Sequence, residues 1–220
     1  MATPSYPLRR KSPRPFASRL VIMVKEPVAG RVKTRLGRGI GTVGATAIYR
    51  AMLSTLVARL GNDRRWETFL AVSPDAACVS HMFPVGTLRV PQGSGDLGRR
   101  MQSLFDGLPP GPVVIIGSDI PAIDPEDIAT AFRELGRNNA VFGPSSDGGY
   151  WLIGLKRLPR IPRAFAHVRW SSENALVDTK LHLAGLRIAH LRVLDDVDTI
   201  EDLKLQRPLV GRRVMPPTQC

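Results

Sequence analysis

Cysteine is scarce in this sequence. The 220 residues include only Cys78 and Cys220, and the second of these is the last residue. A disulfide framework or a cysteine-based zinc site needs several cysteines at fixed spacings, so we expect neither. The four histidines show no ligand spacing and no paired nucleophile, which leaves a Ser-His-Asp hydrolase with little support. We therefore expect a protein of a reducing compartment and predict a cytoplasmic location.

Long apolar runs are absent as well. No run approaches the roughly 20 residues that a transmembrane helix needs, and the first residues lack the apolar block and cleavage site of a secretory signal. We predict neither a membrane span nor export. The hydrophobic content of 43% is still enough to build a substantial core in a chain of this length.

Acidic residues are outnumbered by basic ones, and the formal net charge is +12. Part of the excess lies in residues 1–18, a proline-rich basic segment that we predict to be a disordered tail. Residues 208–220 resemble a second loose tail, which leaves a single domain over residues 19–207. The charge raises nucleic-acid binding as an alternative function. We disfavour it because the first tail does not regularly interleave aromatic residues for base stacking.

Hydrophobic residues recur with two different periods along residues 19–207. Apolar runs typical of strands alternate with segments in which apolar residues recur at helical spacing. We predict strands at 19–25, 67–73, 87–91, 112–117, 139–144, 149–155 and 186–194, and helices at 42–60, 96–108, 124–135, 172–185 and after Thr199. The alternation predicts an α/β fold of three layers, with helices on both faces of a mainly parallel sheet.

A basic loop at residues 26–41 follows the first predicted strand. Arg31, Lys33 and Arg35 alternate in it, and Gly30 permits a close backbone approach. Guanidinium and ammonium groups form charge-assisted hydrogen bonds with phosphate oxygens, so the loop is suited to hold phosphates. A solvated basic loop is the alternative interpretation. The order of residues is not that of a Walker A loop, and "GIGTVG" begins too far from the strand for a dinucleotide fingerprint.

Two polar residues follow the fully apolar strand at residues 112–117. Ser118 and Asp119 come directly after it, and in open α/β sheets ligands bind just beyond the carboxyl ends of strands. A carboxylate at this position is suited to bind a hard divalent cation. The alternative is that Asp119 only caps a turn before the helix that begins at Asp124.

A third cluster separates the two strands predicted at 139–144 and 149–155. Asp147, Gly148 and Gly149 are typical of a hairpin turn. The paired glycines would also let a ligand approach the backbone closely, and Tyr150 could supply a wall of such a site. Both interpretations stay open.

Acidic residues crowd the segment "LDDVDTIEDL" near the end of the domain. Thr199 and Asp202 form a capping box for the last predicted helix. Asp195, Asp196 and Asp198 are not explained by capping. Carboxylates this close repel one another unless a cation or arginines neutralise them, and a metal ion would resolve the repulsion.

Six segments of the sequence follow one another in the order typical of one protein family: "KEPVAGRVKTRLG", "PQGSGDLGRRM", "GSDIPAIDPEDI", "FGPSSDGGYWLIGL", "RWSSENAL" and "DVDTIEDL". In them the sequence resembles the bacterial DUF2064 group of GT-A-fold glycosyltransferase-like proteins. It is similar also to the molybdenum-cofactor and phospholactate guanylyltransferases. The resemblance runs from about Leu20 to Leu205. It implies a nucleotide-diphospho-sugar transferase-like fold that binds a nucleotide and Mg²⁺ or Mn²⁺ at the carboxyl edge of its sheet.

The resemblance also implies roles for single residues. Asp119 matches a metal-binding aspartate, and Asp196 or Asp198 matches a second metal ligand. The positions that match the phosphate-holding loop are Gly30, Arg31, Lys33 and Arg35. The positions that match contacts to the base or the acceptor are Gly93, Gly95, Asp96 and the run from Asp147 to Tyr150, and we add Ser118 beside Asp119 as a further ligand contact.

These observations predict a metal-dependent transferase that uses a nucleotide or nucleotide-sugar donor and a small acceptor. Phosphoryl-type chemistry needs little beyond positioning and neutralised charge. We expect Lys33 and Arg35 to stabilise the charge on the transferring or leaving phosphate and Asp147 to contact the acceptor or serve as a base. Two alternatives remain, a nucleic-acid-binding protein and a GT-A-like protein without catalysis.

The nucleic-acid alternative is tested by deleting residues 1–18. This alternative predicts an affinity for duplex or single strands that falls steeply with salt, because phosphate contacts come from basic side chains. An affinity that resides in the tail should vanish with the deletion. Fluorescence anisotropy with labelled oligonucleotides at two salt concentrations measures this. Salt-sensitive affinity retained by the shortened protein would contradict the prediction.

Overall fold

The computed structural model describes residues 16–206 of the chain. The predicted tail at 208–220 and most of the one at 1–18 lie outside the described residues. The boundaries of the domain therefore stay a prediction.

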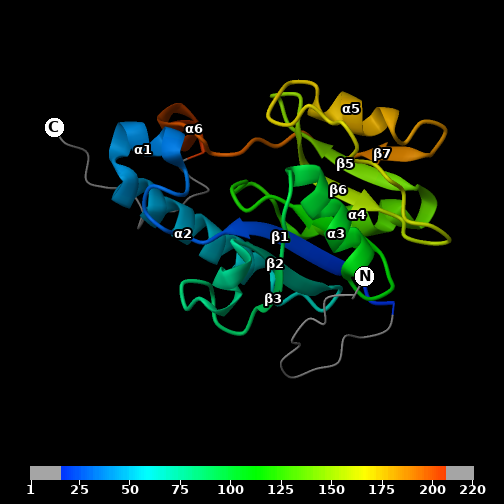
Figure 1. The fold of residues 1–220 in the computed structure, drawn as a ribbon, viewed down its shortest axis with the longest axis horizontal. Helices are drawn as coiled ribbons and strands as arrows, with labels where there is room; N and C mark the ends of the chain where they lie inside the picture. The colour runs from blue at the N-terminus through cyan, green and yellow to red at the C-terminus, as the bar shows by residue number, and fades with distance from the viewer. Residues whose placement is uncertain (1–15, 207–220) are drawn as a thin grey trace.

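Seven strands form one sheet in the order β3-β2-β1-β4-β6-β5-β7 (Figure 1). Strand β6 is antiparallel to both of its neighbours, and all other pairs are parallel. The strands are β1 (Arg19–Lys25), β2 (Glu67–Ser73), β3 (Leu88–Pro91), β4 (Val113–Ile116), β5 (Ala140–Pro144), β6 (Tyr150–Leu155) and β7 (Ile188–His190). The prediction of a mainly parallel sheet is confirmed.

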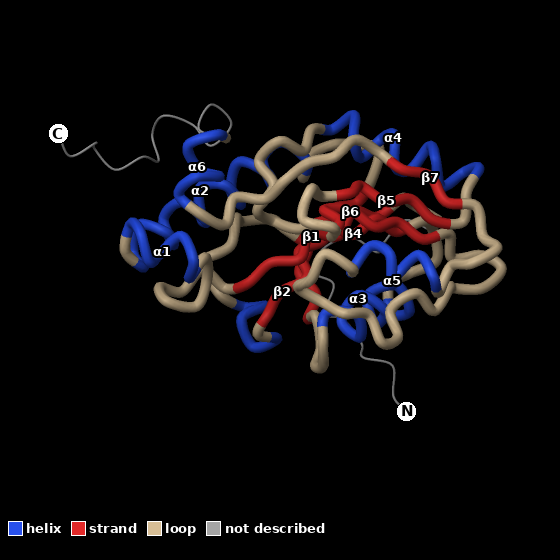
Figure 2. The backbone as a smooth tube through the Cα atoms, turned by 90° about the horizontal axis from the view of Figure 1, so that it is seen from above, coloured by secondary structure: helices blue, strands red, loops and turns tan. Residues whose placement is uncertain are grey.

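Helices cover both faces of this sheet, as Figure 2 shows from above. The helices are α1 (Thr34–Ile40), α2 (Thr42–Leu60), α3 (Leu97–Gly107), α4 (Pro125–Arg137), α5 (Ala175–Leu181) and α6 (Ile200–Leu205), and a 3₁₀ helix spans Asp75–Val79. Buried residues of α2 and α4 pack on one face, and those of α3 pack on the other, where α5 contributes the partly buried Leu176. The predicted three-layer architecture is confirmed.

Strand β1 shows why its sequence is apolar throughout. Leu20, Ile22 and Val24 belong to the core under α2 and α4, while Val21 belongs to the core under α3. Successive side chains of a strand point to opposite faces, and here both faces are covered. A strand in this position therefore has no polar face.

A third, smaller core joins α1, α2 and α6 beyond the end of the sheet. Its buried residues are Leu36, Ala45, Ile48, Met52, Val197 and Leu203. Helices α1 and α6 meet so closely that a Cβ on Gly39 would lie 2.1 Å from the Cδ1 atom of Ile200. Figure 1 shows the two helices side by side although they stand near opposite ends of the chain. This core fixes the start of α1 against the segment that precedes α6.

Three predicted elements differ from the structure. The basic loop predicted at 26–41 contains helix α1, because Leu36 and Ile40 pack into the third core despite the glycines around them. The helix predicted at 172–185 is formed only at Ala175–Leu181. The strand predicted at 186–194 is formed only at Ile188–His190. Leu191 and Leu194 still donate backbone hydrogen bonds to carbonyls of β5, and the residues after Leu194 cross the carboxyl edge of the sheet.

Truncation of a core side chain of β1 should destabilise the protein. Leu20 is fully buried in β1, an interior strand of the sheet, so Leu20→Ala is expected to lower the free energy of unfolding by about 2–5 kcal/mol. Urea denaturation measures the change. The matched control is Leu181→Ala on α5, where the side chain is 67% exposed and the loss should stay under about 0.5 kcal/mol. Equal losses in both variants would contradict the packing described for β1.

Candidate active site

A cleft of about 550 Å³ opens at the carboxyl ends of the central strands. It lies where β1 and β4 end, and helices α1, α2 and α3 contribute to its walls. The residues predicted from the sequence that line it are Arg31, Lys33, Arg35, Gly95, Asp96, Ser118, Asp119, Asp196 and Asp198. The structure thus brings together residues from four separate segments of the chain.

Asp119 is the third residue after β4, on a loop that is held from both sides. The Arg59 guanidinium at the end of α2 donates hydrogen bonds to the carbonyls of Pro121 and Ile123, at 2.8 and 2.7 Å. The N–H of Val197 donates to the Asp119 carbonyl at 3.0 Å. These bonds fix the backbone of Asp119. Its side chain contacts Lys33 and is not held as the cap of a turn.

Side chains of the segment "DVD" at residues 196–198 point alternately to the cleft and to the core. Val197 is fully buried in the third core, whereas Asp196 and Asp198 line the cleft. Residues two apart in an extended segment point to the same side. Burial of one valine therefore directs both carboxylates toward Asp119.

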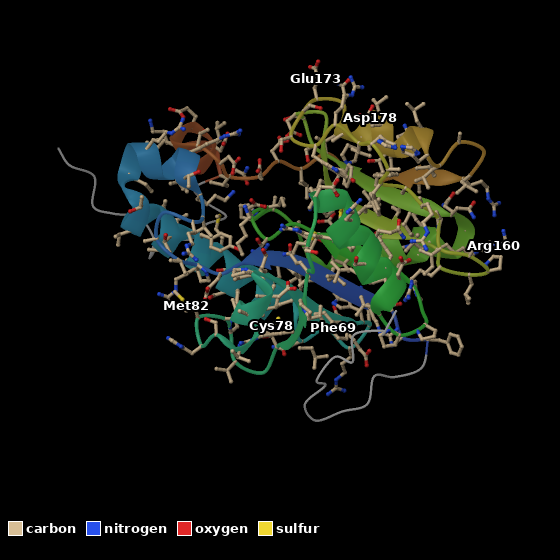
Figure 3. All side chains as sticks on the ribbon, viewed as in Figure 1. Phe69, Cys78, Met82, Arg160, Glu173 and Asp178 are labelled. Carbon is tan, nitrogen blue, oxygen red and sulfur yellow. The ribbon has the colours of Figure 1, made fainter. Side chains whose placement is uncertain are left out.

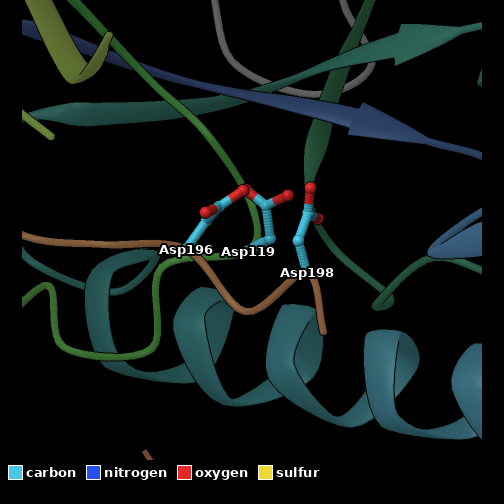
Figure 4. Close-up of side chains that lie close together, drawn as sticks. All are labelled: Asp119, Asp196 and Asp198. Atoms are coloured by element: carbon cyan, nitrogen blue, oxygen red, sulfur yellow. The ribbon is translucent and has the colours of Figure 1, made fainter. Parts of the chain in front are cut away.

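The three aspartates offer carboxylate oxygens that all lie within 4.8 Å of one another. Figure 4 shows their side chains pointing into a common space. Desolvation by the surrounding protein and the like charges of Asp119 and Asp198 raise the pKa of Asp196 to about 6. Hard divalent cations such as Mg²⁺ prefer clustered carboxylate oxygens. The donor set therefore suits Mg²⁺ or Mn²⁺.

Lys33 is the counter-ion of this cluster. Its Nζ atom lies 2.6 Å from Asp119 Oδ2 and 2.6 Å from Asp198 Oδ1, and its side chain is only 4% exposed. Burial alone lowers the pKa of Lys33, but the charges and hydrogen bonds of the two aspartates outweigh it, so the net pKa is raised. The ammonium is therefore charged, and it faces carboxylates in this structure.

Three arginines line the cleft beside the carboxylates. Arg31 and Arg35 come from the segment at the start of α1, and Arg100 comes from the first turn of α3. Arg35 is 71% exposed and lies 3.5 Å from Asp198, a contact that contributes little to stability. Arg100 donates from Nε to the Gly95 carbonyl at 2.9 Å. The cleft thus combines a negative cluster with a positive wall.

Tyr49 and Gln92 line the cleft but were not predicted from the sequence. The Tyr49 hydroxyl accepts from the Lys25 N–H at 3.0 Å and lies 3.2 Å from Ser118 Oγ, so it joins α2 to the ends of β1 and β4. Burial raises its pKa. Gln92 follows β3 directly, so the strand-end rule that identified Asp119 could have identified it. Tyr49 lies on an apolar helix face and gave no comparable signal.

The Gln92 amide has a fixed orientation. Its Nε2 atom donates to the carbonyls of Val24 at 3.1 Å and Ala71 at 2.8 Å. An inverted amide would place its oxygen against these two carbonyl oxygens, so the assignment follows from the hydrogen bonds. The Gln92 Oε1 atom is therefore the atom of this side chain left to accept from a ligand.

Several predicted residues do not line the cleft. They are Gly30, Gly93, Asp147, Gly148, Gly149 and Tyr150. Gly93 has a positive φ, and its N–H donates to Asp75 Oδ1 at 3.0 Å. Tyr150 is half-buried, and its ring packs edge-on against Phe142. Burial raises its pKa, so its hydroxyl stays protonated.

The turn between β5 and β6 has a structural reason for its glycine. Gly148 has a φ of +82°, and a Cβ there would lie 2.1 Å from the Glu173 carbonyl oxygen. The Glu173 side chain points away from the body of the molecule (Figure 3), so only its backbone makes this approach. The hairpin-turn interpretation of Asp147 and Gly148 is confirmed, because β5 and β6 pair antiparallel on either side of it.

Asp195 belongs to this turn and not to the cleft. Its Oδ1 atom accepts from the N–H and the hydroxyl of Ser146, at 2.8 and 2.7 Å. The Asp195 carboxylate therefore stabilises the β5–β6 turn, whereas that of Asp196 lines the cleft.

Residues 56–172 match the family described as an uncharacterized protein conserved in bacteria, DUF2064. The match covers more than half of the chain and includes the strand and loop that carry Asp119. This chain belongs to the DUF2064 family. Neither Lys33 nor Asp198 lies within the matched residues, so their place in the site comes from the structure.

Solved structures share the fold of this DUF2064 protein. A candidate nucleotide-diphospho-sugar transferase from Desulfovibrio desulfuricans G20 is 27% identical, with a TM-score of 0.74 over 88% of this chain and 96% of that one. The 4-diphosphocytidyl-2C-methyl-D-erythritol synthase of Anaerococcus prevotii DSM 20548 is 12% identical, with a TM-score of 0.55 over 89% and 99%. Rv0371C of Mycobacterium tuberculosis H37Rv, in complex with manganese, is 19% identical, with a TM-score of 0.50 over 90% and 99%. The expected GT-A-like fold is confirmed.

No curated protein matches the sequence of this DUF2064 protein. Among residues 16–206, no helix is both long enough and apolar enough to cross a membrane.

The Tyr49 hydroxyl should stabilise the cleft. Tyr49→Phe leaves the Lys25 N–H without this acceptor, so we expect the free energy of unfolding to fall by about 1 kcal/mol or more. Urea denaturation followed by circular dichroism measures it. Ser118→Ala removes only the 3.2 Å contact and should cost less. A Tyr49→Phe variant no less stable than Ser118→Ala would show that the bond to Lys25 is unimportant.

Proposed function

We propose that this protein is a metal-dependent transferase that uses a nucleotide or a nucleotide sugar as its donor. One observation carries the proposal: a single cleft at the carboxyl edge of the sheet holds three clustered carboxylates and three arginines. A metal-bound diphosphate needs both kinds of group, because carboxylates bind the cation and guanidinium groups bind phosphate oxygens. The likeness to the candidate nucleotide-diphospho-sugar transferase from Desulfovibrio supports the same class of donor.

Asp119, Asp196 and Asp198 would hold the divalent ion. Their oxygens are close enough to share one cation, and the charged Nζ atom of Lys33 already lies against two of them. Such an ion would supply positive charge for the diphosphate of the donor. The manganese complex of the Mycobacterium tuberculosis protein supports Mn²⁺ as well as Mg²⁺ as a candidate.

The arginines would hold the phosphates of the donor. Arg31 and Arg100 line the same cleft from different segments of the chain, and a planar guanidinium group can bind two phosphate oxygens at once. Positioning and neutralising charge in this way is the main contribution that a protein makes to phosphoryl-type transfer.

Gln92 would contact the base of the donor. Its amide hydrogens are both used by main-chain carbonyls, which leaves its oxygen as a fixed acceptor. A nucleobase with an exocyclic amine or a ring N–H could donate to it. This arrangement favours a ligand that donates a hydrogen bond here over one that accepts.

Asp147 would act on the acceptor side. It does not line the cleft, but its charge is near enough to contribute to the raised pKa of Asp196. An acceptor that reaches from the cleft toward the β5–β6 turn would meet its carboxylate. A cytoplasmic location, where nucleotide donors are made, is part of the proposal.

Replacement of Asp119 should abolish metal-dependent nucleotide binding. We expect wild-type protein to gain about 2.7 kcal/mol of stability at a ligand concentration of 100 times Kd. Thermal unfolding with nucleoside triphosphates and nucleotide sugars, each with and without Mn²⁺, measures the gain. Asp119→Asn should lose the metal-dependent part because an amide oxygen carries no charge for the cation.

The matched control for this experiment is Asp195→Asn. It also removes one carboxylate, from a residue adjacent to Asp196 that contacts Ser146. Its metal-dependent shift should equal that of the wild type. A shift that survives in Asp119→Asn, or that is lost equally in Asp195→Asn, would refute the assignment of the metal site.

A further inference from the structure

The Lys33 ammonium lies where a cation shared by Asp119 and Asp198 would lie. The Nζ atom is 2.6 Å from one oxygen of each residue. Divalent cations bind carboxylate oxygens at roughly 2.0–2.6 Å. A metal ion bridging these same two oxygens would therefore overlap the space that Nζ takes.

Two cations cannot share this position, because they would clash and repel each other. We infer that Lys33 and the divalent ion compete for Asp119 and Asp198, and that binding of the ion displaces the Lys33 ammonium toward the phosphate side of the cleft. This inference rests on the proposed metal site and goes beyond it. Lys33 would then have two positions, one on carboxylates and one on phosphates.

The backbone around Lys33 is suited to hold a side chain that moves. Lys33 itself has φ +46° and ψ +47°, the left-handed conformation, immediately before α1. Its neighbour Val32 is buried, and Leu36 anchors the helix in the third core. The main chain is therefore fixed on both sides, and a displaced ammonium needs only rotation about the bonds of the lysine stem.

The formal charges favour such an exchange when a donor is bound. The three carboxylates and Lys33 together carry −2, from three negative charges and one positive charge. Replacement of the ammonium by a divalent ion leaves −1 and frees one positive charge for the phosphates lying between the cluster and Arg100. Nucleotide should therefore strengthen metal binding, and by reciprocity metal should strengthen nucleotide binding.

Removal of the competing ammonium should strengthen metal binding without nucleotide. We expect Lys33→Met to bind Mn²⁺ about tenfold more tightly than wild type, equivalent to about 1.4 kcal/mol. Titration of Mn²⁺ followed by electron paramagnetic resonance measures the affinity directly, without an activity assay. Arg35→Met is the matched control, since it removes the same charge from an exposed side chain 3.5 Å from Asp198. Its affinity should change much less.

The outcomes separate this inference from the proposed function. Mn²⁺ binding by Lys33→Met that is equal to or weaker than wild type overturns the competition while leaving the metal site intact. No Mn²⁺ binding by wild type or by either variant overturns the metal site itself, and the competition with it.

A second measurement uses wild-type protein and needs no variant to fold. The Lys33 side chain is 4% exposed, so an amine-acylating reagent should modify it slowly in metal-free protein. Mn²⁺ should increase its modification several-fold, as mass spectrometry of peptides would show, while the exposed Lys204 stays unchanged. Mn²⁺ that binds without changing Lys33 modification would overturn the inference.

Discussion

Mutual repulsion of three carboxylates is the constraint around which the cleft is built. Asp119, Asp196 and Asp198 hold carboxylate oxygens within 4.8 Å of one another, and burial together with the like charges of Asp119 and Asp198 raises the pKa of Asp196. Lys33 offsets that cost with two 2.6 Å contacts from a nearly inaccessible side chain. In the folded protein the start of α1 therefore supplies the positive charge that stabilises the cluster. Carboxylates that already bind the Lys33 ammonium are also arranged to bind a metal ion in its place.

Apolar packing in the small core of α1, α2 and α6 stabilises the contact between Lys33 and Asp198. Lys33 and Asp198 are 165 residues apart in sequence, and no strand pairing joins their segments. The contact depends instead on Leu36 and Val197, which are both fully buried in this core. A few apolar side chains thus stabilise an ion pair that is unfavourable to form in isolation. The sheet therefore positions Asp119, whereas the small core positions Lys33 and Asp198.

Much of the fold and part of the site followed from the sequence. The apolar run before Asp119 was readable because a strand covered on both faces has no polar positions, and the strand-end rule then selected the aspartate. Asp196 and Asp198 were found because capping explained Asp202 and not them. Helix α1 was not found, because glycines conceal a short helix that tertiary packing stabilises. The partner of Lys33 was also beyond the sequence: a lysine in a basic loop gives no sign that it faces aspartates from two distant segments.

The capping box of α6 adds a final requirement to the site. The Asp202 carboxylate accepts from the N–H groups of Asp198 and Thr199, at 3.0 and 2.7 Å. The backbone N–H of Asp198 therefore has its acceptor in the Asp202 carboxylate, and the Asp198 carboxylate is not needed to cap α6. In the reversed arrangement, an Asp198 side chain engaged with the helix N-terminus would be neutralised by backbone donors and a poorer ligand for a cation. Assigning the two tasks to different aspartates keeps the Asp198 oxygens directed at Lys33 and available to whatever cation takes its place.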